Sequence, residues 1–344
     1  MVSWTLAELL RAGLVDAVAH VAPTENDRLF EYRISRTIEE IEGGAKSRYH
    51  PVEMSGVLAE IRRTPGRYAI VGVPCFIKAV QLLRREDPKL QERIVFTLGL
   101  FCGHMKSARM IESFAWQMGT DVSELRRVEH RIKDPSRPAS TYTAEVELKD
   151  GEVRRKDWWN LADGDWGAGF FMNPACDWCD DVIAETADIS FGDAWVEPYS
   201  SDGNGTNVVV VRSPVVAALV ETAIGEGRLH LETVDADFVQ QTQAAGFRHR
   251  REGLAYRLTW RKRGLRPVKR VAPDRDGVPP RRRMVYRMRR IVSRGSNRMF
   301  HLARVLHWPG LYVRWARLAL GAYHAFAYSR GKLGALVDRF RPDA

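Results

Sequence analysis

Long apolar runs and an export signal are both missing from this 344-residue chain. No stretch reaches about 18 consecutive apolar residues, the length that a membrane-spanning helix requires. The first residues, Met1-Val2-Ser3-Trp4, lack the basic region and the cleavage pattern of a signal peptide. The sequence therefore predicts a cytoplasmic protein without membrane-spanning helices. Its composition, 45% hydrophobic and 28% charged, is that of a globular protein with a sizeable core.

Cysteine is scarce, with four residues in the whole chain. Cys176 and Cys179 form a CxxC pair on a Pro-led loop, whereas Cys75 and Cys102 each stand alone just past an apolar run. In the cytoplasm, paired cysteines bind metal or carry out redox chemistry more often than they form structural disulfides. Four thiols with none to spare are what one metal centre or one cluster requires.

Acidic residues are scarce at one end of the chain. From Arg248 to Ala344 there are 26 Lys and Arg against 5 Asp and Glu, while the preceding part holds 27 and 38. The net charge of +10 therefore combines an acidic body with a strongly basic tail. We favour a tail that docks on the body or on a partner protein. The alternative is an anionic membrane surface, at the inner face of the membrane. Nucleic acid ranks last because no recognition motif is present.

Strands and helices alternate in the clearest part of the sequence. Apolar runs at Tyr68–Val73 and Ile94–Phe101 predict buried strands, and helical spacing follows each run. Unalternating apolar strands joined by helices indicate a parallel pair inside a sheet. The right-handed crossover places both carboxyl ends at one edge, so Cys75 and Cys102 should face the same crevice. Both should also precede helix N-termini, whose partial positive charge favours a thiolate.

The rest of the body indicates a mixed sheet. Residues Thr141–Leu148 alternate, Asp150-Gly151 forms a turn signal, and a return strand follows, which together predict a hairpin. We therefore expect an α/β fold with a mixed, partly parallel sheet and flanking helices, followed by a basic helical C-terminal extension.

The composition changes in the last hundred residues. Pro267–Arg283, rich in Pro, Arg and Gly, is typical of a linker. Two amphipathic helices should follow, over Met284–Arg304 and Leu311–Tyr328. We expect a first domain over residues 1–250 and a basic linker with an amphipathic helical tail over 251–344.

Several polar residues outside the cysteines suit an anionic cofactor. These candidate cofactor-binding residues are Gly43, Gly44, Lys46, Arg131, Lys133 and Asp193. The loop from Gly43 to Tyr49, called the glycine loop, offers flexible backbone amides and cations for a phosphate. On this segment alone, however, we favour the interpretation of a plain connector. Arg131 and Lys133 fall on one face of an extended segment, where they would bind an anion or form a solvated edge. Asp193 closes the strand after the CxxC pair.

The cysteine spacing leaves three chemistries open. A structural zinc site usually uses two close pairs, and this chain has one. A thioredoxin-type pair normally begins a helix right after a strand, whereas here two Asp follow the pair and would raise a thiol pKa. An iron–sulfur cluster accepts one close pair plus two isolated ligands, because its sulfides hold the irons. Spacing alone favours a cluster over zinc, with a disulfide or no centre behind them.

Three motifs together resemble a known family. They are Val71-Gly72-Val73-Pro74-Cys75, Leu98-Gly99-Leu100-Phe101-Cys102, and Cys176-Asp177-Trp178-Cys179-Asp180 with Ala187-Asp188-Ile189-Ser190-Phe191-Gly192-Asp193. This combination resembles the family of coenzyme F420 hydrogenase/dehydrogenase beta subunits over residues 2 to 250. The loop Gly44–Tyr49 is similar to that family's Gly-Ser-Lys-Tyr segment.

The resemblance implies an oxidoreductase that is an iron–sulfur flavoprotein. In such a protein, Cys75, Cys102, Cys176 and Cys179 bind one 4Fe–4S cluster. The resemblance also implies FAD close by, with Lys46 and the glycine loop as candidate phosphate contacts. Electrons would pass between the cluster, FAD and a reduced donor such as coenzyme F420 or ferredoxin, or a small-molecule substrate. It does not identify catalytic residues.

One departure from the family supports a second hypothesis. Many members carry a Cys-rich, ferredoxin-like segment ahead of the part where this chain begins, and this sequence lacks it. The alternative function is therefore a cofactor-poor or zinc-stabilised protein that binds or scaffolds a partner through its basic tail. Flavin and metal content distinguish the two hypotheses.

Overall fold

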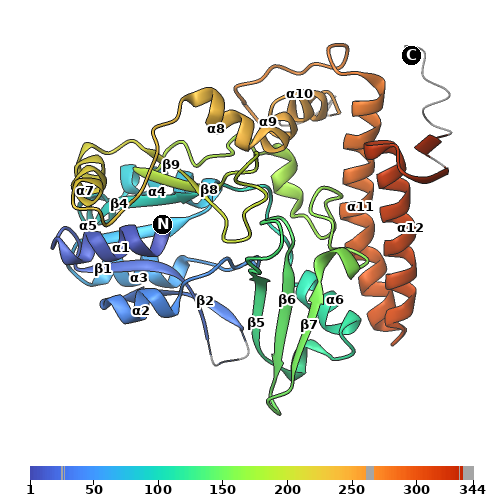
Figure 1. Ribbon diagram of the computed structural model, residues 1–344, viewed down its shortest axis with the longest axis horizontal. Coiled ribbons are helices and arrows are strands. Elements are labelled where there is room, and N and C mark those ends of the chain that lie inside the picture. The colour runs from blue at the N-terminus through green and yellow to red at the C-terminus, as the bar shows by residue number, and fades with distance from the viewer. Residues whose placement is uncertain (25, 27, 261–266, 333, 336–344) are drawn as a thin grey trace.

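In the computed structural model, the first part of the chain forms a six-stranded sheet in the order β2-β1-β3-β4-β8-β9 (Figure 1). Its strands are β1 Ala17–Pro23, β2 Phe30–Ser35, β3 Tyr68–Gly72, β4 Ile94–Leu100, β8 Ile189–Asp193 and β9 Asn207–Val211. β1, β3, β4 and β8 run parallel, and the edge strands β2 and β9 pair antiparallel. The predicted mixed, partly parallel sheet is confirmed. The structure describes residues 1–344 except 25, 27, 261–266, 333 and 336–344.

Helices cover both faces of this sheet. They are α1 Val2–Arg11, α2 Ile38–Gly43, α3 Ser55–Arg63, α4 Pro74–Glu86, α5 Pro88–Arg93 and α7 Pro214–Gly225. Successive side chains of β3 point to opposite faces. Ala69 and Val71 share one core with α1 and α7, whereas Tyr68 and Ile70 share another with α3, α4 and α5. Because both faces are buried, β3 and β4 are apolar without alternation, the pattern that predicts them.

The cysteines lie where the parallel strands end. Pro74 begins α4 directly after β3, so Cys75 lies in the first turn of that helix. A loop follows β4 instead, and α6, Arg109–Gln117, begins seven residues after Cys102. The prediction of a helix N-terminus is therefore confirmed for Cys75 and wrong for Cys102. The backbone N–H of Cys102 donates to the carbonyl of Val182, 2.9 Å away. This contact joins the end of β4 to the segment that directly follows Cys176 and Cys179.

A second sheet of three antiparallel strands adjoins the first. It consists of β5 Leu125–Ile132, β6 Thr143–Leu148 and β7 Val153–Asp157, and it contains the predicted hairpin. Val128 and Val146 pack with Phe114 of α6 in a core that also includes Trp158. Short 3-10 turns lie at η1 Val122–Glu124, η2 Trp158–Asn160 and η3 Pro174–Trp178. The last of these carries Cys176.

The C-terminal part is helical and packs on the body. Its helices are α8 Ala236–Thr242, α9 Ala244–Arg250, α10 Glu252–Leu258, α11 Pro280–Val305 and α12 Pro309–Tyr328. Residues 280–283 belong to α11, so the linker is shorter than predicted, because Pro280 occupies the first turn of a helix. Phe300 and Tyr312 lie in the core that contains Phe114, which confirms the favoured interpretation of a docked tail. The division at residue 250 stays a prediction.

The tail helices form an antiparallel hairpin on one side of the molecule (Figure 1). None of the helices in the described part of the chain is long and apolar enough to cross a membrane. The stretches of the predicted tail at 261–266 and 336–344 lie outside the described residues.

Candidate metal centre

The four cysteines meet at the carboxyl edge of the parallel strands. Burial raises the pKa of Cys75, and the charges of Cys179 and Cys176 act in the same direction. Burial raises the pKa of Cys102 to about 12, with an opposing effect of Arg250 and a further increase from Cys176, Cys75 and Cys179. These mutual effects place the four sulfur atoms within electrostatic reach of one another. None of them forms a disulfide. The topology thus brings together the cysteines that the sequence separates.

A buried arginine faces the thiols. Arg250, at the end of α9, is 1% exposed. Its Nη1 donates to the carbonyl of Gly103 at 2.7 Å, and its Nε has no hydrogen-bond partner among the described residues. Burial lowers the pKa of Arg250, but the charges of Cys102, Cys179 and Cys176 outweigh it and raise that pKa overall. A negatively charged group held by the four thiols would give this unpartnered, buried N–H of Arg250 an acceptor.

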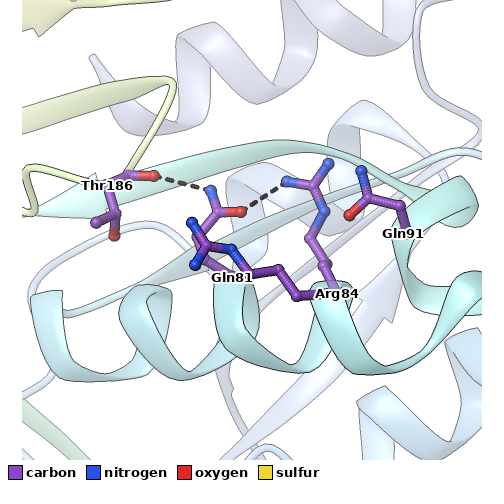
Figure 2. A pocket seen from close by; sticks show the side chains of 5 residues that line it. Gln81, Arg84, Gln91 and Thr186 are labelled. Carbon is purple, nitrogen blue, oxygen red and sulfur yellow. Dashed lines mark hydrogen bonds between the residues drawn. The ribbon is translucent and has the colours of Figure 1, made fainter.

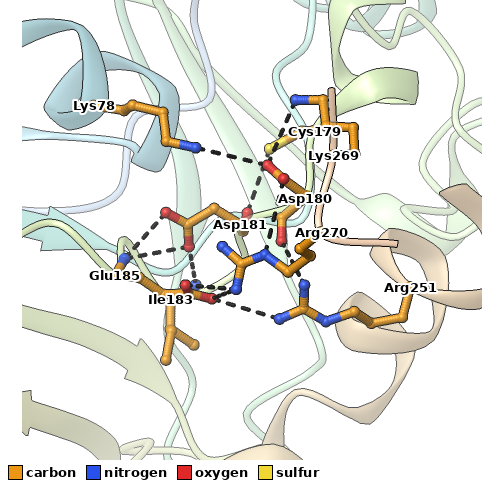
Figure 3. Close-up of polar contacts among 9 residues, drawn as sticks. All are labelled: Lys78, Cys179, Asp180, Asp181, Ile183, Glu185, Arg251, Lys269 and Arg270. Carbon is orange, nitrogen blue, oxygen red and sulfur yellow. Dashed lines mark hydrogen bonds and ion pairs between the residues drawn. The ribbon is translucent and has the colours of Figure 1, made fainter. Parts of the chain in front are cut away.

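Other cations hold the loop of residues 173–181, which carries Cys176 and Cys179 and is called the cysteine loop, in place. Arg257, 1% exposed, donates from Nε to the carbonyl of Asp177 at 2.7 Å. Figure 3 shows Asp180 between Lys78 and Lys269, whose Nζ atoms lie 3.7 and 3.6 Å from its Oδ1. Arg270 bridges the same carboxylate and Glu185, with 2.6 Å from its Nη1 to the Glu185 Oε2. Burial raises the pKa of Asp180, but these three cations lower it overall, so this carboxylate is ionised.

A small cavity opens beside the thiols. It measures about 220 Å³ and is lined by Cys75 and Cys179 together with Lys78, Trp178 and Lys269. In the described residues, no three His, Cys, Asp or Glu side chains converge closely enough to hold a single metal ion. A cubane cluster is several atoms across, so its four thiolates stand farther apart than the ligands of one ion. The donor set, the orphaned Arg250 Nε and the adjacent cavity fit a cluster of this kind.

A larger cavity lies elsewhere and carries none of the candidates. It measures about 370 Å³ and is lined by Gln81, Arg84, Arg85, Gln91 and Thr186 (Figure 2). The Gln81 amide donates to the Thr186 carbonyl at 2.8 Å and accepts from Arg84 at 2.9 Å. Since its polar groups largely satisfy one another, we assign it no role in the chemistry.

The glycine loop is tied to the first and second sheets. Gly43 ends α2, and a side chain at Gly44 would meet the ring of His20, with 2.3 Å between the added Cβ and Cε1. Lys46 adopts a left-handed backbone conformation, with φ 88°, which is uncommon for a residue with a side chain. Its Nζ lies 3.6 Å from Glu129 of β5, while Arg48 contacts the same carboxylate at 2.7 Å.

The structure brings Arg131 and Asp193 together. Arg131 of β5 donates to the Asp193 carboxylate at 2.6 Å, and its guanidinium lies 4.4 Å from the ring centre of Tyr142. Its Nε is buried without a hydrogen-bond partner in the described structure. Lys133 points instead to the turn at residue 204, where Nζ donates to the Asn204 carbonyl. Lys46 therefore contacts β5 through Glu129, and Arg131 belongs to the same strand. Lys133 lies apart from both.

Aromatic and buried polar residues fill the space between the two groups of candidates. Trp166 stacks on His104 at 4.6 Å between ring centres and contacts Tyr49 at 4.9 Å. Lys106 lies 4.8 Å from the centre of the Trp166 ring and donates to the Phe170 carbonyl at 2.7 Å. Burial lowers the pKa of Lys106 to about 7. The sequence did not predict that Lys106 lies buried against Trp166.

Arg250 and Arg257 were missed for a physical reason. A run such as Arg248-His249-Arg250-Arg251 predicts a solvated face as readily as a buried contact. Arg250 is buried against Gly103, next to Cys102, and Arg257 against Asp177 of the loop that carries Cys176 and Cys179. These contacts join segments 147 and 80 residues apart in sequence. No local signal separates Arg250 from the exposed Arg248 two residues before it, and Glu252 directly follows the run.

Two family models match the chain. The N-terminal model of the coenzyme F420 hydrogenase/dehydrogenase beta subunit covers residues 1–59, and its C-terminal model covers residues 66–237. The chain belongs to the family of coenzyme F420 hydrogenase/dehydrogenase beta subunits. The resemblance inferred from the motifs is confirmed. All four cysteines and all six candidate cofactor-binding residues lie inside the matched ranges, whereas Arg250 and Arg257 lie beyond them.

Individual relatives agree with the family. The chain is 27% identical over 217 residues to a component of the F420H2 dehydrogenase of Methanosarcina mazei, a match that covers 62% of this chain and 55% of that protein. The chain thus spans about half the length of this relative. A chain of the F420-reducing NiFe hydrogenase complex from Methanosarcina barkeri superposes with a TM-score of 0.57 and 19% identity, covering 77% of this chain and 88% of that chain. At this identity the likeness shows the fold alone.

Proposed function

We propose that this protein is an oxidoreductase and an iron–sulfur flavoprotein. Cys75, Cys102, Cys176 and Cys179 hold one 4Fe–4S cluster, FAD binds near the glycine loop, and electrons are exchanged with a reduced donor such as coenzyme F420 or ferredoxin, or with a small-molecule substrate. The observation that carries the proposal is the convergence of the four thiols at one sheet edge. The protein acts in the cytoplasm, where thiols remain reduced and free to bind a metal centre.

The residues around the thiols support a charged centre. A bound cluster supplies single-electron transfer, and a flavin converts it to two-electron hydride chemistry. The backbone N–H of Met105 donates to the Cys176 sulfur at 3.3 Å, and Arg250 places a cation beside Cys102 and Cys179. Both contacts stabilise negative charge on sulfur. The salt bridges of Asp180 fix the position of the adjoining Cys179.

The glycine loop and β5 support a neighbouring anionic cofactor. Lys46 is held in an uncommon backbone conformation, a feature that concentrates at binding sites. Its side chain is 56% exposed and its contact with Glu129 is long, so the ammonium group is available to a phosphate. Arg131 forms an ion pair with Asp193, which balances the charge of its guanidinium. This pairing suits Arg131 to orient the neighbouring Tyr142 more than to bind an anion.

The composition of the purified protein tests the proposal. We expect anaerobically purified protein to contain about four iron and four acid-labile sulfide per chain, together with flavin that a reductant bleaches. Cys176→Ser removes one thiolate and should lose most of the iron and sulfide. Ala175→Ser provides the matched control, because it adds the same hydroxyl at the neighbouring exposed position and leaves all four thiols in place.

Other outcomes contradict the proposal. Zinc in place of iron, or no metal and no flavin, would support the cofactor-poor binding protein instead. Equal loss of iron in Cys176→Ser and Ala175→Ser would show that the loop conformation, and not the thiolate, retains the metal.

A further inference from the structure

The end of the α11–α12 hairpin presents an unusual surface. We define the hairpin tip as Arg298, residues 301–309, Arg314 and Arg317. Apart from Ala303, these side chains are exposed. The apolar ones expose large fractions of their surface: Val305 60%, Leu306 54%, Trp308 48% and Leu302 43%. Single exposed apolar residues are ordinary, but several grouped at the end of one element mark an interaction site.

The charge at the tip has one sign. No Asp or Glu occurs in the sequence between Asp276 and Asp338, an interval that contains 13 Lys and Arg. Arg314 lies over the ring of Trp308, 5.8 Å from its centre. Arg304 is 3.6 Å from Glu112 of α6, which is 20% exposed. The tip therefore combines cations with Leu, Val and Trp side chains and leaves Arg298, Arg314 and Arg317 toward solvent.

Packing fixes the tip in this orientation. Phe300 stacks on Trp116 of α6 at 4.3 Å between ring centres, and the Tyr312 hydroxyl donates to the buried carboxylate of Asp163 at 2.8 Å. The apolar stripe that contains Phe300 and Tyr312 is thus used inside the core. The exposed Leu and Trp residues are additional to that stripe, so folding of this chain alone does not explain them.

We propose that the hairpin tip binds the surface of an anionic lipid bilayer. Cations next to aliphatic side chains and a Trp match the interface, where phosphates meet acyl chains. Exposed Leu and Val contribute nothing to phosphate contacts in a nucleic acid, which would use stacking or groove-reading side chains instead. The attachment we propose is peripheral, through side chains of the tip that enter the interface.

The position of the tip leaves the metal centre accessible. In Figure 1, the turn between α11 and α12 lies at the lower end of the hairpin, whereas α9 and α10, which contact the cysteine loop, lie beside its upper end. A bilayer at the tip would therefore hold the protein at a membrane without covering the cavity at Cys75 and Cys179. Attachment through the tip is independent of which cofactors the protein binds.

Vesicle binding by the full-length protein tests the proposal. We expect it to co-sediment with vesicles of phosphatidylglycerol and phosphatidylcholine, to bind more weakly as salt is raised, and not to bind pure phosphatidylcholine. Arg314→Gln/Arg317→Gln should weaken binding roughly 25-fold, since each basic residue near an anionic bilayer contributes about fivefold. Leu306→Ser/Trp308→Ser should weaken it by roughly tenfold or more. All four side chains are exposed, so the fold should survive.

A matched control separates the tip from overall charge. Arg85→Gln/Lys89→Gln removes the same charge from exposed positions on α4 and α5, on the opposite side of the molecule (Figure 1). It should change vesicle binding only slightly. Absence of binding to phosphatidylglycerol vesicles would overturn the proposal, even if the protein bound duplex DNA or an acidic protein. Equal weakening in the control and in the arginine variant would also overturn it.

Discussion

At the scale of single residues, Arg250 has the clearest expected effect on the metal centre. Its buried guanidinium lies beside Cys102 and Cys179 and has one unpartnered N–H. Arg250→Gln should therefore release iron to a chelator roughly 10- to 100-fold faster, since a hydrogen bond to a charged group contributes about 1.5–3 kcal/mol. Iron release from the anaerobic protein, followed by absorbance, measures this rate.

Two further variants give the result its meaning. Arg250→Lys keeps the charge and should recover part of the retention. Arg248→Gln removes an exposed arginine of the same helix and should leave the rate unchanged. If both glutamine variants released iron equally fast, the role assigned to Arg250 would be wrong and general destabilisation of α9 would explain the loss.

The residue scale also shows where sequence reasoning works. Cys75 and Cys102 could be placed together from the sequence because the crossover rule fixes which ends of parallel strands meet. Cys176 and Cys179 could be assigned to the same site from the family motif, but not from the geometry of the strands. Arg250 and Arg257 could not be predicted, because their burial depends on α9 and α10 docking on loops far away in the sequence. Lys106 is hidden for the same reason, since only the fold places Trp166 over it.

At the scale of elements, the hairpin of α11 and α12 is part of the body's core. Phe300 is fully buried and contacts the rings of Trp116, Phe171 and Tyr312. Phe300→Ala should lower the free energy of unfolding by about 3–5 kcal/mol, the usual cost of emptying such a site. Urea denaturation followed by far-UV circular dichroism measures the loss.

An exposed position on the partner helix provides the control. Leu318→Ala changes a side chain that is 76% exposed and should shift the free energy of unfolding by less than about 0.5 kcal/mol. A Phe300→Ala protein as stable as Leu318→Ala would show that the hairpin is not integrated into the core as described.

Element boundaries were predicted best where the pattern is purely local. The apolar strands follow from their unbroken apolar runs, the two tail helices from helical periodicity, and the hairpin of β6 and β7 from its turn. The helix expected from about Lys106 to Met118 forms as α6, but it begins three residues later, at Arg109. The chain after Cys102 is held by tertiary contacts such as the one with Val182, which no local pattern encodes. The start of α11 at Pro280 was assigned to a linker because Pro and Arg are common in both linkers and first helical turns.

At the scale of the whole molecule, buried histidines make stability depend on pH. Burial lowers the pKa of His20 and His50 to about 4 and that of His130 to about 3, with His50 and Arg48 adding to the effect at His130. In the unfolded chain a histidine has a pKa of about 6.5. The unfolded state therefore binds more protons below that pH. The stability from these neutral rings is complete above pH ~6.5 and is lost as the pH falls toward their folded values.

His130 allows this effect to be isolated. Its ring is 0% exposed, neither nitrogen has a hydrogen-bond partner among the described residues, and it packs against Phe30 and Tyr49. Relative to His130→Leu, the wild-type protein should lose about 1.4 kcal/mol of unfolding free energy for each pH unit below about 6.5. Urea denaturation at pH 7, 6 and 5 measures the difference. His301→Gln, in which an exposed ring is replaced, should follow the wild-type profile. If His130→Leu also followed the wild-type profile, protonation of this ring would not be what limits stability in acid, and the remaining buried histidines would have to account for it.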